Sequence, residues 1–267
     1  MFLAIDPSDV FLKFSQPNTK LKKLAKTEFA RPWLEPTASR GKRKVYSLDL
    51  LSGWTCPFAV DCKAKVYVME NMKKKLRDDP RAKFRCFSAT EEVAFPTVYN
   101  LRNRNLQALR RLKTAEEMAD ALQAAMPADA GIIRIHVGGD FFAPEYFDAW
   151  IILAKRRPDV LFYAYTKSIP YWVARIDDLP DNLSMTASRG GSRDDLIDEY
   201  GLKEAEVIYD PDHANGREID HDDSHAANKS QGSFALLLHG QQPAGSEASA
   251  AIKSMKQRGI EFAYSAR

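Results

Sequence analysis

Three cysteines are the residues whose type and spacing point most directly to chemistry. Five residues separate Cys56 from Cys62, and 23 residues separate Cys62 from Cys86. Three thiolates on one face of a protein suit an iron–sulfur cluster in which one iron is not held by cysteine. Structural zinc sites usually contain tight C-x2–4-C pairs, which this spacing lacks. Free cysteines are also often simply buried, so the spacing leaves a metal site and three unconnected core thiols equally open.

Polar residues at the ends of predicted strands are the second group of candidates. A single histidine is more often a hydrogen-bonded core residue, but its place before Gly138, Gly139 and Asp140 makes His136 a candidate fourth metal ligand or proton-transfer group. Asp140 is the other candidate for that ligand position. Lys167 ends an aromatic strand, where it would either bind a carboxylate or phosphate or lie at the surface. The remaining candidates at strand ends are Ser188, Arg189 and His239.

A segment rich in Asp and His is a weaker candidate for a metal site. His221 and His225 lie four residues apart among Asp220, Asp222 and Asp223. Such a cluster could bind a divalent cation. We favour the simpler interpretation, a solvated acidic loop.

The strand-end candidates follow segments that are predicted to be β-strands. β-Branched and aromatic residues predict strands at 44–51, 132–137, 160–166, 183–187, 206–209, 234–239 and 260–265. Helices are predicted near 144–157, 170–177, 193–200 and 247–258. Strands that alternate with helices form a parallel sheet, and the carboxyl ends of its strands meet on one face. We therefore expect the candidate residues to gather there.

This alternation predicts one α/β domain over residues 44–267, behind an irregular basic arm of residues 1–43. The fold that we expect is parallel and βα-barrel-like, a partial TIM-type barrel, and a doubly wound open sheet is the alternative. Residues 54–126 are expected to hold the cysteine-bearing loops and helices. The clearest helix among them is 115–126, because Thr114 and Glu117 form a capping box at its start.

Composition excludes several classes of protein. With 267 residues, 45% of them hydrophobic, the chain can bury a sizeable core and is not a disulfide scaffold or a disordered tail. No apolar run reaches the roughly 18 residues of a membrane span. The start of the chain lacks a secretory signal, which predicts a cytoplasmic location and reduced cysteines. P-loop, GxGxxG, GxSxG and HExxH motifs are absent, which excludes the enzyme classes that they mark.

The distribution of charge is uneven, although the net charge is only +3. Residues 1–44 carry ten Lys and Arg against four Asp and Glu, and residues 71–113 carry twelve against four. Such regions bind nucleic acid in some proteins and form a solvated basic face in others. Both interpretations stay open.

Taken together, several motifs resemble the phage-associated "gene product 88" family, whose members are largely uncharacterised. The resemblance runs from about residue 15 to the end of the chain, and it implies a phage or prophage protein. Its motifs are TCPFAVDC, RCFSATEE, IHVGGDFFAPEYFDAW, FYAYTKS, SRGG, DHDDSHA and FALLLHGQQPAG.

The chain more loosely resembles the radical S-adenosylmethionine enzymes. In these partial or full βα barrels, three cysteines after the first strand hold a [4Fe-4S] cluster, and a GGE-like motif after the second strand contacts the amine of the cofactor. Here the three cysteines follow the first predicted strand, and Gly138-Gly139-Asp140 follows the second. The superfamily spaces its cysteines C-x3-C-x2-C, and this chain does not. The resemblance therefore implies the cluster more strongly than the radical chemistry.

These observations lead us to expect a phage-type [4Fe-4S] protein related to radical S-adenosylmethionine enzymes, of unknown substrate. The resemblance implies that Gly138, Gly139 and Asp140 would line the amine of S-adenosylmethionine, and that Lys167 or Arg189 would meet its carboxylate. The alternative is a non-catalytic module, stabilised by the cluster, that binds nucleic acid or a host protein through its basic surface.

Overall fold

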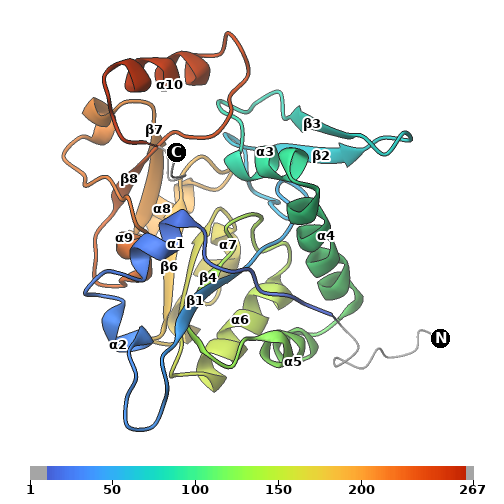
Figure 1. The fold of residues 1–267 in the computed structure, drawn as a ribbon, viewed down its shortest axis with the longest axis vertical. Helices are drawn as coiled ribbons and strands as arrows, with labels where there is room; N and C mark the ends of the chain where they lie inside the picture. The colour runs from blue at the N-terminus through green and yellow to red at the C-terminus, as the bar shows by residue number, and fades with distance from the viewer. Residues whose placement is uncertain (1–10, 263–267) are drawn as a thin grey trace.

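A six-stranded parallel sheet lies at the centre of the protein (Figure 1). The computed structural model describes residues 11–262. Neighbouring strands in the sheet follow the order of the chain without a reversal, so the sheet curls into a half-barrel. Its strands are β1 (Lys44–Leu48), β4 (Ala130–Ile135), β5 (Leu161–Thr166), β6 (Leu183–Ser188), β7 (Glu204–Ile208) and β8 (Phe234–Leu237).

The central strands are apolar on both faces, because both faces of the sheet are covered. In β4, Ile132, Ile133 and Ile135 are fully buried, and they point alternately to the two sides. Such near-continuous apolar runs are typical of parallel strands that are sandwiched between other elements. Arg134 is the only charged residue of this strand.

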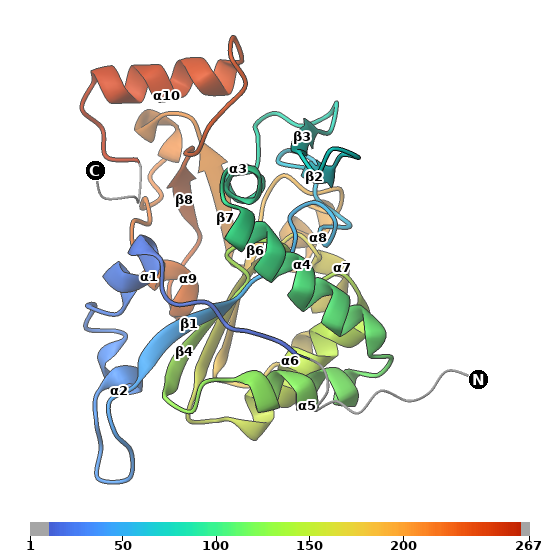
Figure 2. The ribbon, with the colours of Figure 1, turned by 45° about the vertical axis from the view of Figure 1, so that its right-hand side comes forward.

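Four helices cover the outer face of the sheet (Figure 2). They are α4 (Pro96–Arg111), α5 (Ala115–Ala125), α6 (Pro144–Arg156) and α7 (Ile169–Val173). The predicted capping box is confirmed at the start of α5, where the Thr114 hydroxyl accepts from the Glu117 N–H and the Glu117 carboxylate accepts from the Thr114 N–H. Trp150 of α6 is fully buried against Phe162 of β5.

The inner face is covered by the N-terminal arm and a late loop. The arm, expected to be irregular, contains α1 (Thr19–Leu24) and α2 (Arg31–Leu34), which pack with α9 (Ser224–Ala227) against the sheet. Leu21 and Leu24 are fully buried there. The arm is also joined to the edge of the sheet, since Ser15 and Ser47 exchange two backbone hydrogen bonds of 2.7 and 3.1 Å. This arm is therefore part of the packed structure.

The sequence did not predict the antiparallel hairpin β2 (Ala64–Val68) and β3 (Lys74–Asp78), where loops and helices were expected. The hairpin projects beside α3 (Phe87–Ala94) and α4 (Figure 1). The remaining elements are α8 (Asp195–Glu199), α10 (Glu247–Gln257) and the 3-10 turns Ile176–Asp178 and Pro211–Ala214.

The expected fold class is confirmed at the level of a mixed α/β chain with an open parallel sheet. Six of the seven predicted strands are present, with ends that differ by a few residues. The seventh, at 260–265, is not: residues 260–262 are not in a strand, and 263–265 lie outside the described residues. None of the helices in the described part of the chain has the length and apolarity that crossing a membrane requires.

Candidate functional site

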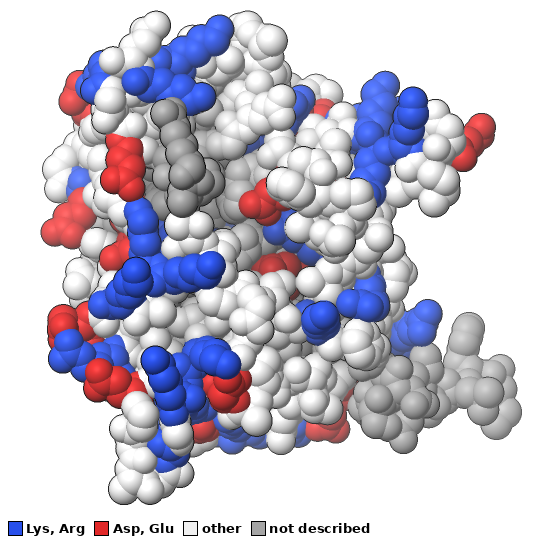
Figure 3. Space-filling model, in the orientation of Figure 1, with Lys and Arg blue, Asp and Glu red and all other residues white. Residues whose placement is uncertain are grey.

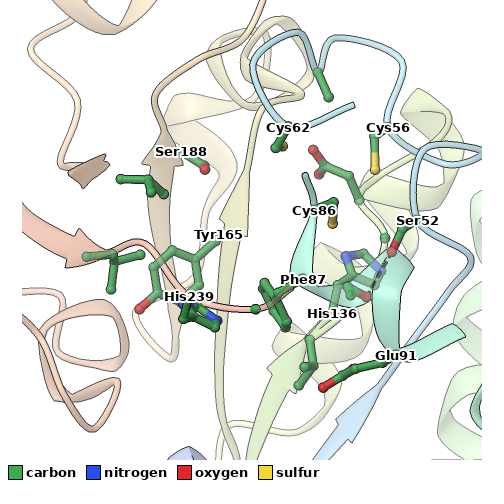
Figure 4. Close-up of a pocket in the computed structure, with 18 of the residues that line it drawn as sticks. Ser52, Cys56, Cys62, Cys86, Phe87, Glu91, His136, Tyr165, Ser188 and His239 are labelled. Carbon is green, nitrogen blue, oxygen red and sulfur yellow. Dashed lines mark hydrogen bonds between the residues drawn. The ribbon is translucent and has the colours of Figure 1, made fainter. Parts of the chain in front are cut away.

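A cavity of about 430 Å3 lies at the carboxyl ends of the strands. This is the size range of small-molecule sites, and the carboxyl ends are where parallel α/β proteins bind ligands. Figure 4 shows the three cysteines at one end of it, Tyr165, Ser188 and His239 at the other, and Phe87 between them. Most of the candidate residues therefore lie together on one face of the sheet, as expected. Those that line the cavity are Cys56, Cys62, Cys86, His136, Gly139, Asp140, Lys167, Ser188 and His239.

Two segments of the chain bring the cysteines together. Cys56 and Cys62 lie on the loop between β1 and β2, which is tied to the end of β6 because the Val60 and Asp61 N–H groups donate to the Gly190 carbonyl. Cys86 immediately precedes α3. The backbone N–H groups of Ser88 and Ala89 in the first helical turn partly oppose the rise in its pKa, since the helix dipole favours negative charge there.

Partial burial raises the pKa of all three thiols, because it reduces the solvation of the thiolate. The pKa of Cys86 reaches about 12, and that of Cys56 lies well above its ordinary value. Lys167 opposes the rise at Cys62, since its positive charge favours a thiolate. A raised pKa favours the protonated thiol, which is a weaker nucleophile than the thiolate. A metal centre would displace their protons on binding.

The described residues show no side-chain group that could hold a single metal ion. In residues 11–262, no group of three or more His, Cys, Asp or Glu side chains is gathered closely enough to hold one ion. The cysteines are nevertheless near enough for Cys62 and Cys86 each to raise the pKa of Cys56. In iron–sulfur proteins each thiolate binds a different iron, so such a cluster does not need ligands gathered around one ion.

His136 is an unusual buried residue beside these cysteines. Its φ of 69° lies in the left-handed region that few residues other than glycine adopt, and such strain collects at functional sites. Its Nε2 is hydrogen-bonded to the Tyr146 hydroxyl at 2.9 Å. Its Nδ1 is buried and has no hydrogen-bond partner within the described residues. Burial lowers the pKa of His136 to about 3, so the ring is neutral and Nδ1 is able to act as a ligand.

Asp140 is already occupied by hydrogen bonds. Its carboxylate accepts from the Thr166 hydroxyl at 2.6 Å and from the N–H groups of Phe141 and Lys167 at 2.8 Å each. These bonds join the end of β4 to the end of β5. Burial raises the pKa of Asp140 to about 6. Of the two residues predicted as a fourth ligand, His136 is therefore the one with an unused atom.

The two glycines before Asp140 have different surroundings. Gly139 lines the cavity with a φ of +91°. Gly138 lies instead against α3 and α4, where a Cβ would come within 2.2 Å of the Ser88 hydroxyl and 2.7 Å of the Arg102 guanidinium carbon. Close packing of these helices explains the glycine at 138.

Of the two cations predicted to meet a ligand, Lys167 lines the cavity and Arg189 does not. Lys167 is buried at the cavity, and its ammonium donates to the Ser188 carbonyl and hydroxyl at 2.8 and 2.9 Å and to the Arg189 carbonyl at 2.5 Å. In the part of the chain that is described, no carboxylate lies within ion-pair distance of it. The Arg189 side chain lies outside this cavity and pairs with Glu204 and Asp198.

The end of the cavity opposite the cysteines contains the rings of Tyr165 and His239. The His239 ring centroid lies 4.6 Å from that of Phe87, which lies between this end and the cysteines. Burial lowers the pKa of His239 to about 4. Sequence reasoning identified His239 but not the two aromatic residues, because aromatic residues on strands and helices are most often core.

A buried group of charges, which we call the charged cluster, lies between the N-terminal arm and the inner face of the sheet. The Asp223 carboxylate accepts from the hydroxyls of Tyr163 and Tyr165 and pairs with Lys20 at 2.8 Å and Arg134 at 2.5 Å. Lys20, Arg134 and Tyr165 also line the cavity. The members of the charged cluster are Lys20, Arg134, Tyr163, Tyr165, Asp220 and Asp223.

This arrangement corrects the expectation of a solvated acidic loop at 220–225. Asp220 and Asp223 are fully buried ion-pair partners, and His225 is held by Glu218 and Asp220. Arg134 is the residue from which the charged cluster could have been predicted, since a single charge inside a buried strand needs a buried partner. Nothing near Lys20 in the sequence shows which partner it has, because the partner lies 200 residues away.

The fold and site define a half-barrel α/β protein with a cysteine-lined cavity at the carboxyl ends of its strands. The chain belongs to the Gene product 88 family, whose model matches residues 12–257. The Gene 88 protein of Mycobacterium phage L5 is 37% identical over 65 residues, which cover 20% of this chain and 27% of that relative. No solved structure matches. The expected family is thus confirmed, whereas these comparisons give no support to the radical S-adenosylmethionine resemblance.

Proposed function

We propose that this protein binds a [4Fe-4S] cluster through Cys56, Cys62 and Cys86. The observation that carries the proposal is the convergence of three unpaired cysteines, from segments on either side of a hairpin, on one end of a single cavity. Unrelated core thiols have no reason to share a cavity wall. The unused Nδ1 of His136, which lines the same cavity, supports a fourth ligand beside the three thiolates.

The order of elements also supports a relation to radical S-adenosylmethionine enzymes. The cysteine loop follows β1, the first strand of the parallel sheet, and Gly139 and Asp140 follow β4, the second. A partial TIM-type barrel with this order is the arrangement that the resemblance implies. When bound, such a cluster supplies electrons one at a time. The aromatic end of the cavity, beyond the cysteines, is where an organic cofactor such as S-adenosylmethionine would bind.

The test is anaerobic purification followed by iron and acid-labile sulfide analysis. We expect about four irons per chain and broad absorption in the visible range. Cys56→Ser, Cys62→Ser and Cys86→Ser should each lose the iron. Thr90→Ala alters the same cavity without removing a thiol, so that control variant should retain it. A well-folded protein that binds zinc or no metal would overturn the proposal.

The second candidate function is a non-catalytic module in which His136 permanently occupies the fourth iron. This second function is favoured by the His136 ring, whose Nε2 is hydrogen-bonded to Tyr146 and whose Nδ1 has no partner within the described residues. Adding S-adenosylmethionine to the reduced protein separates the two functions. A shift in the electron paramagnetic resonance spectrum with release of 5′-deoxyadenosine supports the enzyme, and an unchanged spectrum with no product supports the module.

A further inference from the structure

The β2–β3 hairpin has two chemically different faces, because side chains alternate along each strand. Val66 is fully buried against the body of the protein. The opposite face carries Lys65 and Tyr67 on β2, and the residues directly across the ladder from them are Arg77 and Lys75. Lys75 and Arg77 are exposed. The outward face of the hairpin therefore presents three cations around an aromatic ring.

A second aromatic residue and a fourth cation extend this face. Trp54, which is 38% exposed, lies edge-on to Tyr67 with ring centroids 5.3 Å apart. The Lys65 ammonium lies 4.6 Å from the centre of the Trp54 ring, and the Arg77 guanidinium lies 5.0 Å from that of Tyr67. From α4, Arg110 donates to the Trp54 carbonyl at 3.4 Å. We call this set the hairpin surface: Trp54, Lys65, Tyr67, Lys75, Arg77 and Arg110.

The cations of the hairpin surface lack acidic partners. In residues 11–262, none of the four forms an ion pair, whereas nearby Arg85 is held by Asp78 through three contacts of 2.5–3.0 Å. Arginines on other faces are paired in the same way, such as Arg156 with Glu116 and Asp120. Figure 3 shows Lys and Arg side chains gathered over the hairpin. The surface thus has positive charge that nothing in the described chain neutralises.

We propose that the hairpin surface binds single-stranded nucleic acid. Unpaired Lys and Arg neutralise phosphates and release counterions, and exposed aromatic rings stack on bases. A duplex hides the faces of its bases within its own stack, so the interleaved rings favour a single strand. The proposal rests on the hairpin, α4 and Trp54 of the β1–β2 loop. It does not require the cluster to be bound, because no residue of the hairpin surface lines the cavity.

The test is fluorescence anisotropy with the full-length protein and labelled oligo(dT), oligo(rU) and a DNA duplex of the same length. Either single strand should bind at least about tenfold more tightly than the duplex at low salt. The ratio of the affinities for oligo(dT) and oligo(rU) shows whether the hairpin surface prefers single-stranded DNA or RNA. In the triple variant Lys75→Ala, Arg77→Ala and Arg110→Ala, the slope of log K against log salt should fall by about 2, since each phosphate contact contributes about 0.7.

Two controls locate the binding. Lys155→Ala, Lys253→Ala and Lys256→Ala together remove the same charge from exposed positions on α6 and α10, and should leave the affinity within about twofold. Binding should also quench tryptophan emission, and Trp54→Phe should remove the quenching while keeping a ring to stack. Equal or tighter binding to the duplex, no binding to either single strand, or equal losses in the two triple variants would each overturn the proposal.

Discussion

The cysteine end of the cavity and the charged cluster are both buried and polar, but they differ in how far their polar atoms are satisfied. At Asp223, two cations and two tyrosine hydroxyls occupy both carboxylate oxygens. At the cysteine end, burial raises the pKa of the thiols, and the His136 Nδ1 has no partner in the part of the chain that is described. A buried polar group with all its partners stabilises a fold, and one without a partner has an atom that a ligand can use. The contrast favours a structural role for the first region and agrees with the binding role that we propose for the second.

The largest effect should come from breaking the satisfied region. Asp223→Asn leaves Lys20 and Arg134 buried without one of their counter-charges, and we expect a loss of about 3–5 kcal/mol in the free energy of unfolding. Urea unfolding measures it, in the presence and absence of iron. The matched control Asp181→Asn changes an exposed carboxylate paired with Lys229 and should cost less than about 1 kcal/mol. A loss of similar size in both variants would contradict the structural role.

Removing iron should have the next largest effect on the free energy of unfolding. The effect should require the three cysteines. A ligand that binds the folded chain alone stabilises it by about 2.7 kcal/mol at a hundred times its Kd, so chelation should lower the free energy of unfolding by at least about this amount. In Cys86→Ser, the same chelator should change nothing. If iron removal leaves the wild-type stability unchanged, the cysteine end is not a ligand site.

Acid should act on the charged cluster in the metal-free protein. Burial alone would raise the pKa of Asp223, but Arg134 and Lys20 outweigh it and hold that pKa well below its usual range. A depressed folded-state pKa contributes stability that is present above about pH 4 and is lost as the pH falls. We expect a loss of about 1.4 kcal/mol per pH unit below that point from this group. Unfolding measured at a series of pH values should show a flatter profile for Asp223→Asn.

The effect most specific to the spectrum should come from His136→Ala. Without S-adenosylmethionine, we expect the neutral Nδ1 to be the fourth ligand, so the variant should keep its iron but change its electron paramagnetic resonance spectrum. Tyr146→Phe removes the hydrogen bond to Nε2 and keeps the ring, and it should change the spectrum less. An unchanged spectrum in His136→Ala would show that the fourth iron has no histidine ligand.

Local patterns made much of the fold predictable. The apolar runs of the central strands and the Thr114–Glu117 capping box depend on neighbours in the sequence, and both were predicted. The β2–β3 hairpin was missed because β3 is basic: Lys74, Lys75 and Arg77 reduce the strand signal that hydrophobic alternation would give. The last predicted strand, at 260–265, has the right composition, but residues 260–262 lie outside any sheet.

The site was predictable where chain order determines position. Cys56, Cys62, His136 and Asp140 follow β1 and β4, whose carboxyl ends meet, so their proximity follows from the topology. Cys86 instead reaches the cavity from the residue before α3. The chain order did not predict which of these residues would line the cavity. Gly138 packs against α3 and the Arg189 side chain pairs with acidic residues, because packing and pairing depend on residues far away in the sequence. For the same reason, the burial of Asp220 and Asp223 could not be read from a segment that looks solvated.

The ion pair between Lys20 and Asp220 also fixes an order of events during synthesis. A ribosome that adds about 5–20 residues per second makes Asp220 roughly 10–40 s after Lys20. For that interval, α1 and its leucines have no complete inner sheet face to cover, since β8 and α9 are made later still. α1 is therefore made well before it can reach its final place. Its apolar, basic segment must stay unaggregated while about 200 further residues are made.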